Sequence, residues 1–297
     1  MYFRTATVFM LSALIFSPAT YSPAMAQHAQ RIAIPEISTP GTEKMVDVGG
    51  RKLDCCVYGN GGPTVVLVSG FGAPQSYWNS VVPDLADQIT VVTYDRAGIG
   101  RSEIGDLPTH GLQATKDLHA LLEKLNVPQP YILVGHSYGG GVVRLYASNH
   151  PDRMGGLILV DTQHEDILDE QRKALTGKDL ETLEQMVERF GTPENPRTEA
   201  DYRNITLEQL KNSKPLPRIP FVVISAGDRS KGMPPMFSEE GKEKLQLLGA
   251  QLQQKLVDLV PGGEHIVVEG VGHNIHAEKP EALIEPTLEM VTEVRGS

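Results

Sequence analysis

Cysteine is scarce in this chain of 297 residues, which contains only Cys55 and Cys56. The two are adjacent in a segment that is typical of a strand, so their side chains point to opposite faces and a bond between them would be strained. A disulfide framework is therefore excluded. We interpret both as small apolar strand residues, with an intermolecular bridge as the alternative.

Clusters of basic residues are also lacking. The chain has 27 Lys and Arg against 37 Asp and Glu, which gives a formal net charge of −10. Binding to nucleic acid or to an anionic membrane requires neutralisation by Lys and Arg, so neither is expected as a partner. The composition favours a small-molecule substrate.

Sequence signs of a cofactor or a metal site are missing as well. The glycine-containing segment 95–100 is not followed by the Lys-Ser/Thr of a nucleotide-binding P-loop. His, Cys and carboxylate residues do not show the spacing of metal ligands. We therefore expect neither a cofactor nor a metal.

The apolar run at residues 5–16 is shorter than the ~20 residues that a membrane-spanning helix needs. Arg4 precedes it, and Ala24-Met25-Ala26 has the small residues that a signal peptidase reads. We interpret residues 1–26 as a secretory signal peptide rather than a membrane anchor, and expect export to the periplasm or the medium. Prolines punctuate residues 27–43, which predicts an extended leader.

The rest of the chain alternates strand and helix patterns. A hairpin at 45–48 and 52–58 precedes buried strands at 64–68, 89–94, 132–134, 157–160, 221–224 and 265–268. Helical spacing between them predicts an α/β fold, a mostly parallel sheet with helices on both faces. Residues 164–217 break the alternation with helical spacing alone, which predicts a helical cap inserted into a domain at 44–297.

A serine between glycines follows the strand at 132–134. The segment Gly135-His136-Ser137-Tyr138-Gly139 stands at the junction between that strand and a helix pattern at 141–149. A serine on such a turn is held in a strained backbone conformation, and glycines are needed where the strand and helix approach closely. We interpret Ser137 as a catalytic nucleophile.

The order of elements and this turn resemble the α/β-hydrolase fold superfamily over nearly the whole mature chain, most closely its single-domain esterase-like members. The resemblance implies a catalytic acid after the serine and a histidine after the last strand. It favours His273 as the general base over His276, which is expected to be structural. His136 is expected to pack near the site.

Two aspartates at strand ends are candidates for the acid. Asp161 follows the strand at 157–160, and Asp228 follows the strand at 221–224. The later position is the commoner one in the superfamily, but Asp228 comes directly after Gly227, whereas the acid usually lies a few residues further on. We favour Asp161 and keep Asp228 as the alternative.

The resemblance also implies an oxyanion hole formed by main-chain N–H groups. Tyr138, after the nucleophile, is expected to supply one. Phe71, in Ser69-Gly70-Phe71-Gly72, is expected to supply the other, although Ser69 stands where the superfamily more often has histidine. The loop at 95–100 resembles one that shapes the floor near the site.

These observations predict an exported serine hydrolase that cleaves a carboxylic ester or a lactone through an acyl-enzyme intermediate. The alternatives are a slow or non-catalytic ligand-binding protein of the same fold, and a peptidase, thioesterase or lyase with the same catalytic residues. The cap is expected to govern substrate selectivity more than chemistry. The sequence does not indicate the natural substrate or the oligomeric state.

Overall fold

A computed structural model describes residues 35–106, 108–189, 199–231 and 233–296 of the chain. The predicted signal peptide at 1–26 and the first part of the predicted leader lie outside the described residues. No helix within the described ranges combines the length and apolar character that crossing a bilayer requires.

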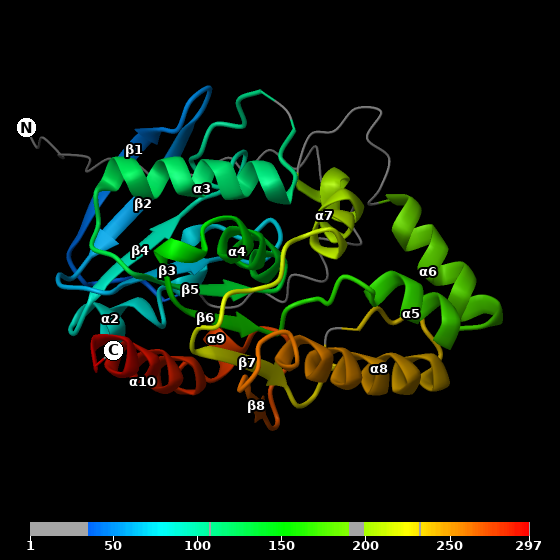
Figure 1. Cartoon of the computed structure of the whole chain (residues 1–297). Helices are drawn as coiled ribbons and strands as arrows, with labels where there is room; N and C mark the ends of the chain where they lie inside the picture. Colours follow the sequence, from blue (N-terminus) through cyan, green and yellow to red (C-terminus); the bar gives the residue numbers. More distant parts are fainter. Residues whose placement is uncertain (1–34, 107, 190–198, 232, 297) are drawn as a thin grey trace, which may run out of the picture. The chain divides into compact units, whose positions relative to one another are not determined.

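The centre of the fold is an eight-stranded sheet with the spatial order β1-β2-β4-β3-β5-β6-β7-β8 (Figure 1). β1 pairs antiparallel with β2, and β2 with β4, while the other neighbouring strands are parallel. The strands are β1 (Gly41–Asp47), β2 (Lys52–Tyr58), β3 (Thr64–Val68), β4 (Thr90–Tyr94), β5 (Tyr131–His136), β6 (Met154–Val160), β7 (Phe221–Ala226) and β8 (Glu264–Val268).

Helices connect the strands and cover the sheet (Figure 1). They are η1 (Gln75–Trp78), α2 (Val82–Ala86), α3 (Gly111–Leu125), α4 (Tyr138–Asn149), η2 (Pro151–Arg153), α5 (Ile167–Ala174), α6 (Gly177–Arg189), η3 (Glu199–Tyr202), α7 (Arg203–Lys211), α8 (Glu239–Val257), α9 (Ile275–Glu278) and α10 (Glu281–Gly296). The predicted α/β architecture is confirmed.

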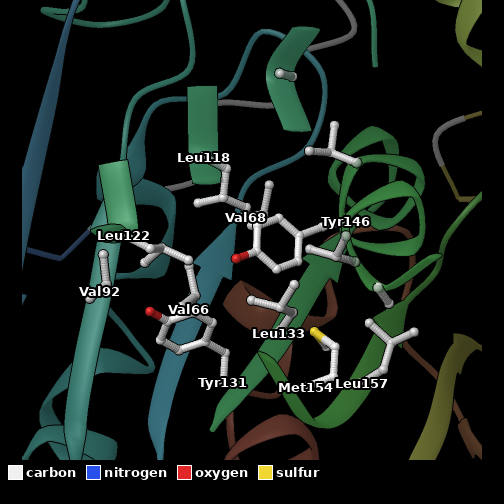
Figure 2. Close-up of a cluster of buried hydrophobic side chains, with 14 of the residues drawn as sticks. Val66, Val68, Val92, Leu118, Leu122, Tyr131, Leu133, Tyr146, Met154 and Leu157 are labelled. Carbon is white, nitrogen blue, oxygen red and sulfur yellow. The ribbon is translucent and has the colours of Figure 1, made fainter. Parts of the chain in front are cut away.

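Both faces of the sheet are buried, which explains the unbroken apolar runs of the central strands. Val66 and Val68 of β3 pack with Leu118 of α3 and Tyr146 of α4 in one cluster (Figure 2). The alternate β3 residue Val65 belongs to a second cluster on the opposite face, which includes buried residues of α2 and α10. Successive side chains of one strand therefore serve two cores.

The predicted start of the first strand differs from the structure by four residues. β1 begins at Gly41 rather than residue 45, so the predicted leader ran too far into the fold. Most β1 side chains are exposed, and its limits come from pairing with β2 rather than from an apolar pattern. Between β3 and β4, η1 and α2 are separate short helices, with a proline in the first turn of α2.

The stretch between β6 and β7 contains only helices among its described residues, as the cap prediction requires. Leu183 of α6 clusters with Leu245 of α8. Leu207 and Leu210 of α7 cluster with Leu145 of α4, the helix that follows Ser137. The cap is thus packed on the helix that begins at the proposed nucleophile.

Candidate active site

Ser137 lies on a tight turn between β5 and α4. Its backbone has φ 52° and ψ −117°, a conformation that non-glycine residues rarely adopt. Its N–H donates to the Val160 carbonyl at 2.9 Å. At Gly139, a Cβ atom would lie 2.5 Å from the Ser69 carbonyl oxygen and closer still to that of Val68. The glycine therefore allows α4 to start directly against the end of β3.

A line of hydrogen bonds joins Ser137, His273 and Asp161. The Ser137 Oγ lies 3.0 Å from His273 Nε2, and His273 Nδ1 lies 2.6 Å from Asp161 Oδ2. An ionised carboxylate only accepts hydrogen bonds, so the imidazole proton belongs on Nδ1. Nε2 is then free to accept the serine proton, as a general base must.

Asp161 is held by further donors at the end of β6. Its side chain is only 4% exposed. Oδ1 accepts a hydrogen bond from the Ala226 N–H at 3.1 Å and another from the Arg229 guanidinium. Burial alone would raise the pKa of Asp161, but the hydrogen bond from His273 and the charges of His273 and Arg229 outweigh it and lower this pKa below its ordinary value. Asp161 is therefore ionised at neutral pH.

Asp228, the other candidate acid, is turned away from this line. Its Oδ1 accepts a hydrogen bond from the Ser230 hydroxyl at 2.5 Å, whereas the carboxylate that His273 Nδ1 contacts is that of Asp161. The next residue, Arg229, is the one that contacts Asp161. Gly249 of α8 leaves room for it, since a Cβ there would lie 2.9 Å from Arg229 Cδ. The structure brings together Asp161 and His273 and leaves Asp228 outside.

The other two histidines near the site are buried behind His273. The His136 ring centroid lies 4.7 Å from those of both His273 and His276, and its Nε2 lies 2.9 Å from the His273 carbonyl oxygen. Burial lowers the pKa of His136 well below its ordinary value, and that of His276 to about 4. Both are therefore neutral packing residues at neutral pH.

The predicted oxyanion-hole residues lie next to one another. Tyr138 is the first residue of α4, where main-chain N–H groups lack partners within the helix. The Phe71 ring packs edge-on against the Tyr138 ring, with centroids 5.9 Å apart. At Gly70, a Cβ would lie 3.3 Å from the Ser137 Cβ, so this loop touches the nucleophile turn. The donor roles of Phe71 and Tyr138 stay predictions.

No group of three or more His, Cys, Asp or Glu side chains that could hold a metal ion occurs among the described residues. Cys55 and Cys56 are both free and buried, and they belong to the clusters on opposite faces of the sheet. Burial raises the pKa of Cys55 to about 12. A thiol of that pKa is protonated and unreactive at neutral pH.

Residues 63–248 match the family model described as the alpha/beta hydrolase fold, and the chain belongs to this family of hydrolases. The uncharacterized protein YqjL of Bacillus subtilis is 28% identical over 240 residues, which are 77% of this chain and 85% of that protein. The epoxide hydrolase CorEH has a TM-score of 0.59 at 20% identity, covering 86% of this chain and all of that one. A thermophilic esterase from Thermogutta terrifontis has a TM-score of 0.56 at 20% identity, and the match covers 86% of this chain and 99% of the esterase chain. At such identity the two solved structures establish the fold alone.

Proposed function

We propose that the protein is an exported serine hydrolase that cleaves a carboxylic ester or a lactone through an acyl-enzyme intermediate. The observation that carries the proposal is the line from Ser137 Oγ through His273 to Asp161, with distances of 3.0 and 2.6 Å. A hydroxyl that is hydrogen-bonded to a neutral imidazole, itself oriented by a buried carboxylate, is the arrangement that acyl transfer requires.

In the first half of the reaction, the Ser137 oxygen attacks the carbonyl carbon while its proton moves to His273 Nε2. The imidazolium that forms is stabilised by the ionised Asp161. The tetrahedral intermediate collapses when His273 donates the proton to the leaving alcohol oxygen, and the acyl group stays on Ser137.

In the second half, His273 takes a proton from a water molecule, which attacks the acyl-enzyme and releases the carboxylic acid. His273 is 45% exposed, which gives solvent access to the base. The oxyanion of both intermediates is stabilised by the N–H groups of Phe71 and Tyr138, and the N-terminus of α4 adds a partial positive charge.

A serine-directed fluorophosphonate tests the chemistry. The purified mature protein should form one adduct on Ser137 and hydrolyse short acyl esters, and Ser137→Ala should do neither. The control is a Ser230→Ala variant, which removes an exposed serine near Asp228 and should be labelled normally. An unlabelled wild type, as inert towards esters as Ser137→Ala, would support the ligand-binding alternative and overturn this proposal.

Export is tested separately. The mature protein from the native host should begin at or near Gln27, because Ala24 and Ala26 are the small residues that a signal peptidase recognises. N-terminal sequencing of the exported fraction measures this. Recovery of the chain with Met1 in the cytosol would refute both cleavage and export.

A further inference from the structure

The loop at 69–72 is held by a guanidinium as well as by its own turn, in which the Ala73 N–H donates to the Gly70 carbonyl at 3.2 Å. Arg96, at the end of β4, donates from Nη1 to the Ser69 carbonyl at 2.6 Å and from Nη2 to the Gly70 carbonyl at 2.7 Å. The Gly70 carbonyl and the Phe71 N–H belong to one planar peptide unit and point in opposite directions. Fixing the carbonyl therefore fixes the direction of the N–H that we expect to bind the oxyanion.

The cap supplies the partner of Arg96. Glu199 of η3 accepts hydrogen bonds from Arg96 Nε at Oε2 and from Arg96 Nη2 at Oε1, both at 2.7 Å. Its Oε1 also accepts from the Gly72 N–H at 2.7 Å. Both side chains of the ion pair are 3% exposed, so their mutual attraction is little screened by solvent. One cap carboxylate thus contacts the arginine and the loop at once.

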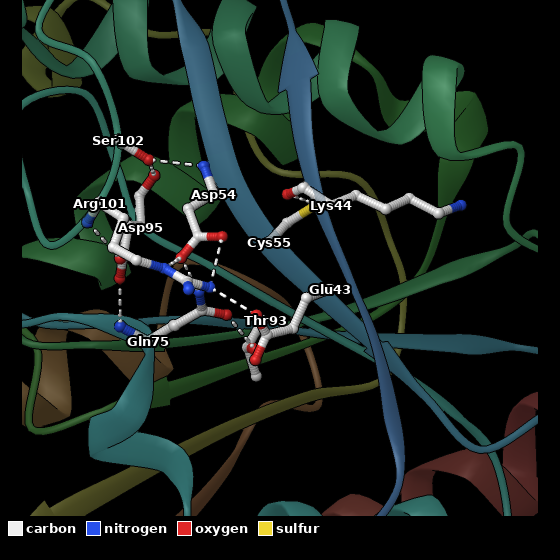
Figure 3. Close-up of polar contacts among 9 residues, drawn as sticks. All are labelled: Glu43, Lys44, Asp54, Cys55, Gln75, Thr93, Asp95, Arg101 and Ser102. Carbon is white, nitrogen blue, oxygen red and sulfur yellow. Dashed lines mark hydrogen bonds and ion pairs between the residues drawn. The ribbon is translucent and has the colours of Figure 1, made fainter.

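Asp95, the residue before Arg96, is anchored by residues outside the cap (Figure 3). Asp95 Oδ1 accepts from the Gln75 N–H at 2.6 Å, and Oδ2 accepts from the Arg101 N–H at 3.1 Å. The Ser102 hydroxyl donates to the Asp95 carbonyl at 2.6 Å. Because these contacts fix the main chain next to Arg96, the orientation of the Arg96 side chain depends on its partner Glu199.

The cap also contacts the second expected oxyanion donor. The Tyr138 hydroxyl lies 3.2 Å from the Thr206 hydroxyl of α7, and the Arg96 guanidinium carbon lies 5.4 Å from the centre of the Tyr138 ring. This contact reaches Tyr138 only through its side chain. The stronger connection between cap and oxyanion hole is therefore the one through Glu199.

We propose that Glu199 is a positioning residue that couples the cap to the oxyanion hole through Arg96 and the loop at 69–72. The inference rests on the proposed function, because an oxyanion forms only if Ser137 attacks a carbonyl. It gives the cap a part in the chemistry, beside the larger role in selectivity that the sequence predicts for it. Loss of Glu199 leaves Arg96 buried without its carboxylate and weakens the hold of Arg96 on the Gly70 carbonyl, which keeps its longer hydrogen bond from the Ala73 N–H.

The oxyanion exists only in the transition states and intermediates, so the effect should fall on kcat. Glu199→Gln keeps the size of the side chain but removes its charge and presents NH₂ to a donor. We expect kcat to fall by roughly 10- to 100-fold with KM within about threefold of wild type. The affinity for a boronic acid that forms a tetrahedral adduct on Ser137 should fall in parallel.

The matched control is Glu208→Gln, which removes an exposed cap carboxylate on α7 that pairs with the Lys211 ammonium at 3.1 Å. This variant should keep the wild-type kcat and KM. Arg96→Lys keeps a positive charge near Glu199 but loses the fork that reaches both carbonyls, and it should repeat the selective loss of kcat. This second variant tests the proposal if Glu199→Gln does not fold.

The results separate this inference from the function on which it rests. Suppose that wild-type Ser137 is labelled by fluorophosphonate, but the folded Glu199→Gln and Arg96→Lys enzymes keep the wild-type kcat, with or without a raised KM. The positioning role is then wrong. A lowered melting temperature with unchanged kcat would make the contact purely structural and would also overturn it. An unlabelled wild type would overturn the proposed function and this inference together.

Discussion

Replacing His276 by phenylalanine should remove part of the acid sensitivity of the fold. His276 is 1% exposed, and neither of its ring nitrogens has a hydrogen-bond partner among the described residues. Its ring centroid lies 5.2 Å from that of Trp78 and 5.7 Å from that of Tyr77. Besides Tyr77, the titratable groups beside it are His136, whose ring centroid lies 4.7 Å away, and His273. Burial, with a smaller contribution from His273, lowers the pKa of His276 to about 4.

The direction in which stability changes with pH follows from proton uptake at His276. Below pH 6.5 the unfolded chain binds a proton at His276, whereas the folded protein binds it only near pH 4. The free energy of unfolding therefore decreases as the pH is lowered from 6.5 towards 4. The gap from 6.5 to about 4 corresponds to about 3 kcal/mol at 1.36 kcal/mol per pH unit, of which about 2 kcal/mol is lost by pH 5. His136, with its pKa also lowered by burial, adds to the same loss and remains in the variant.

Urea unfolding at about pH 7.5 and about pH 5 measures the effect. The drop in the free energy of unfolding between the two should be smaller by about 2 kcal/mol in His276→Phe than in wild type. His276→Gln should show the same reduced drop from a lower starting stability, because its buried amide lacks partners but does not titrate. Equal drops in wild type and both variants would refute the reasoning.

Three further predictions follow from single contacts. Asp161→Asn should lower kcat by roughly 10²- to 10⁴-fold without unfolding the protein, because the amide no longer stabilises the imidazolium. Asp228→Asn should keep a kcat near that of wild type, and the reverse pattern in steady-state kinetics would exchange the roles of the two aspartates. Gly139→Ala should cost about 3 kcal/mol or more, since its Cβ meets main-chain oxygens. Gly141→Ala meets side-chain carbons, the nearest at 3.3 Å, and should change stability by about 1 kcal/mol or less, so similar melting temperatures of the two variants would contradict this. Glu165→Gln should lower the free energy of unfolding by about 3–5 kcal/mol at neutral pH, because it leaves the buried Arg144, which Glu165 contacts at 2.7 and 3.0 Å, without a counter-charge. A denaturant titration that shows no loss of stability would disprove this.

Strands buried on both faces were predictable from local pattern. The bounds of β3 agree residue for residue with the sequence prediction, because each of its five side chains is buried and apolar or β-branched. The exposed edge strand β1 was predicted four residues short at its start. Its pairing partner, β2, defines where it begins, and pairing leaves no apolar signature in the sequence.

The choice between Asp161 and Asp228 could not be made from spacing alone, since both follow parallel strands at the same edge of the sheet. The difference lies in side-chain direction. Asp161 adopts φ 41° and its carboxylate meets His273, whereas the Asp228 carboxylate turns to Ser230 two residues along the chain. Backbone conformation at a single residue is set by its tertiary contacts, which a strand-end position does not encode.

The two charged residues that sequence reasoning missed, Arg229 and Glu199, have one feature in common. Each contacts the site across a long stretch of chain, 68 residues from Arg229 to Asp161 and 103 residues from Glu199 to Arg96. In the sequence, a single charge in a polar segment is typical of a solvated surface, and only the folded chain removes the water from around it. The proposed nucleophile and base occupy positions that local pattern defines, whereas the groups that set their charge and alignment come from tertiary packing. Variants of Arg229 and Glu199 should therefore alter how well the chemistry is aligned while the Ser137 turn itself stays intact.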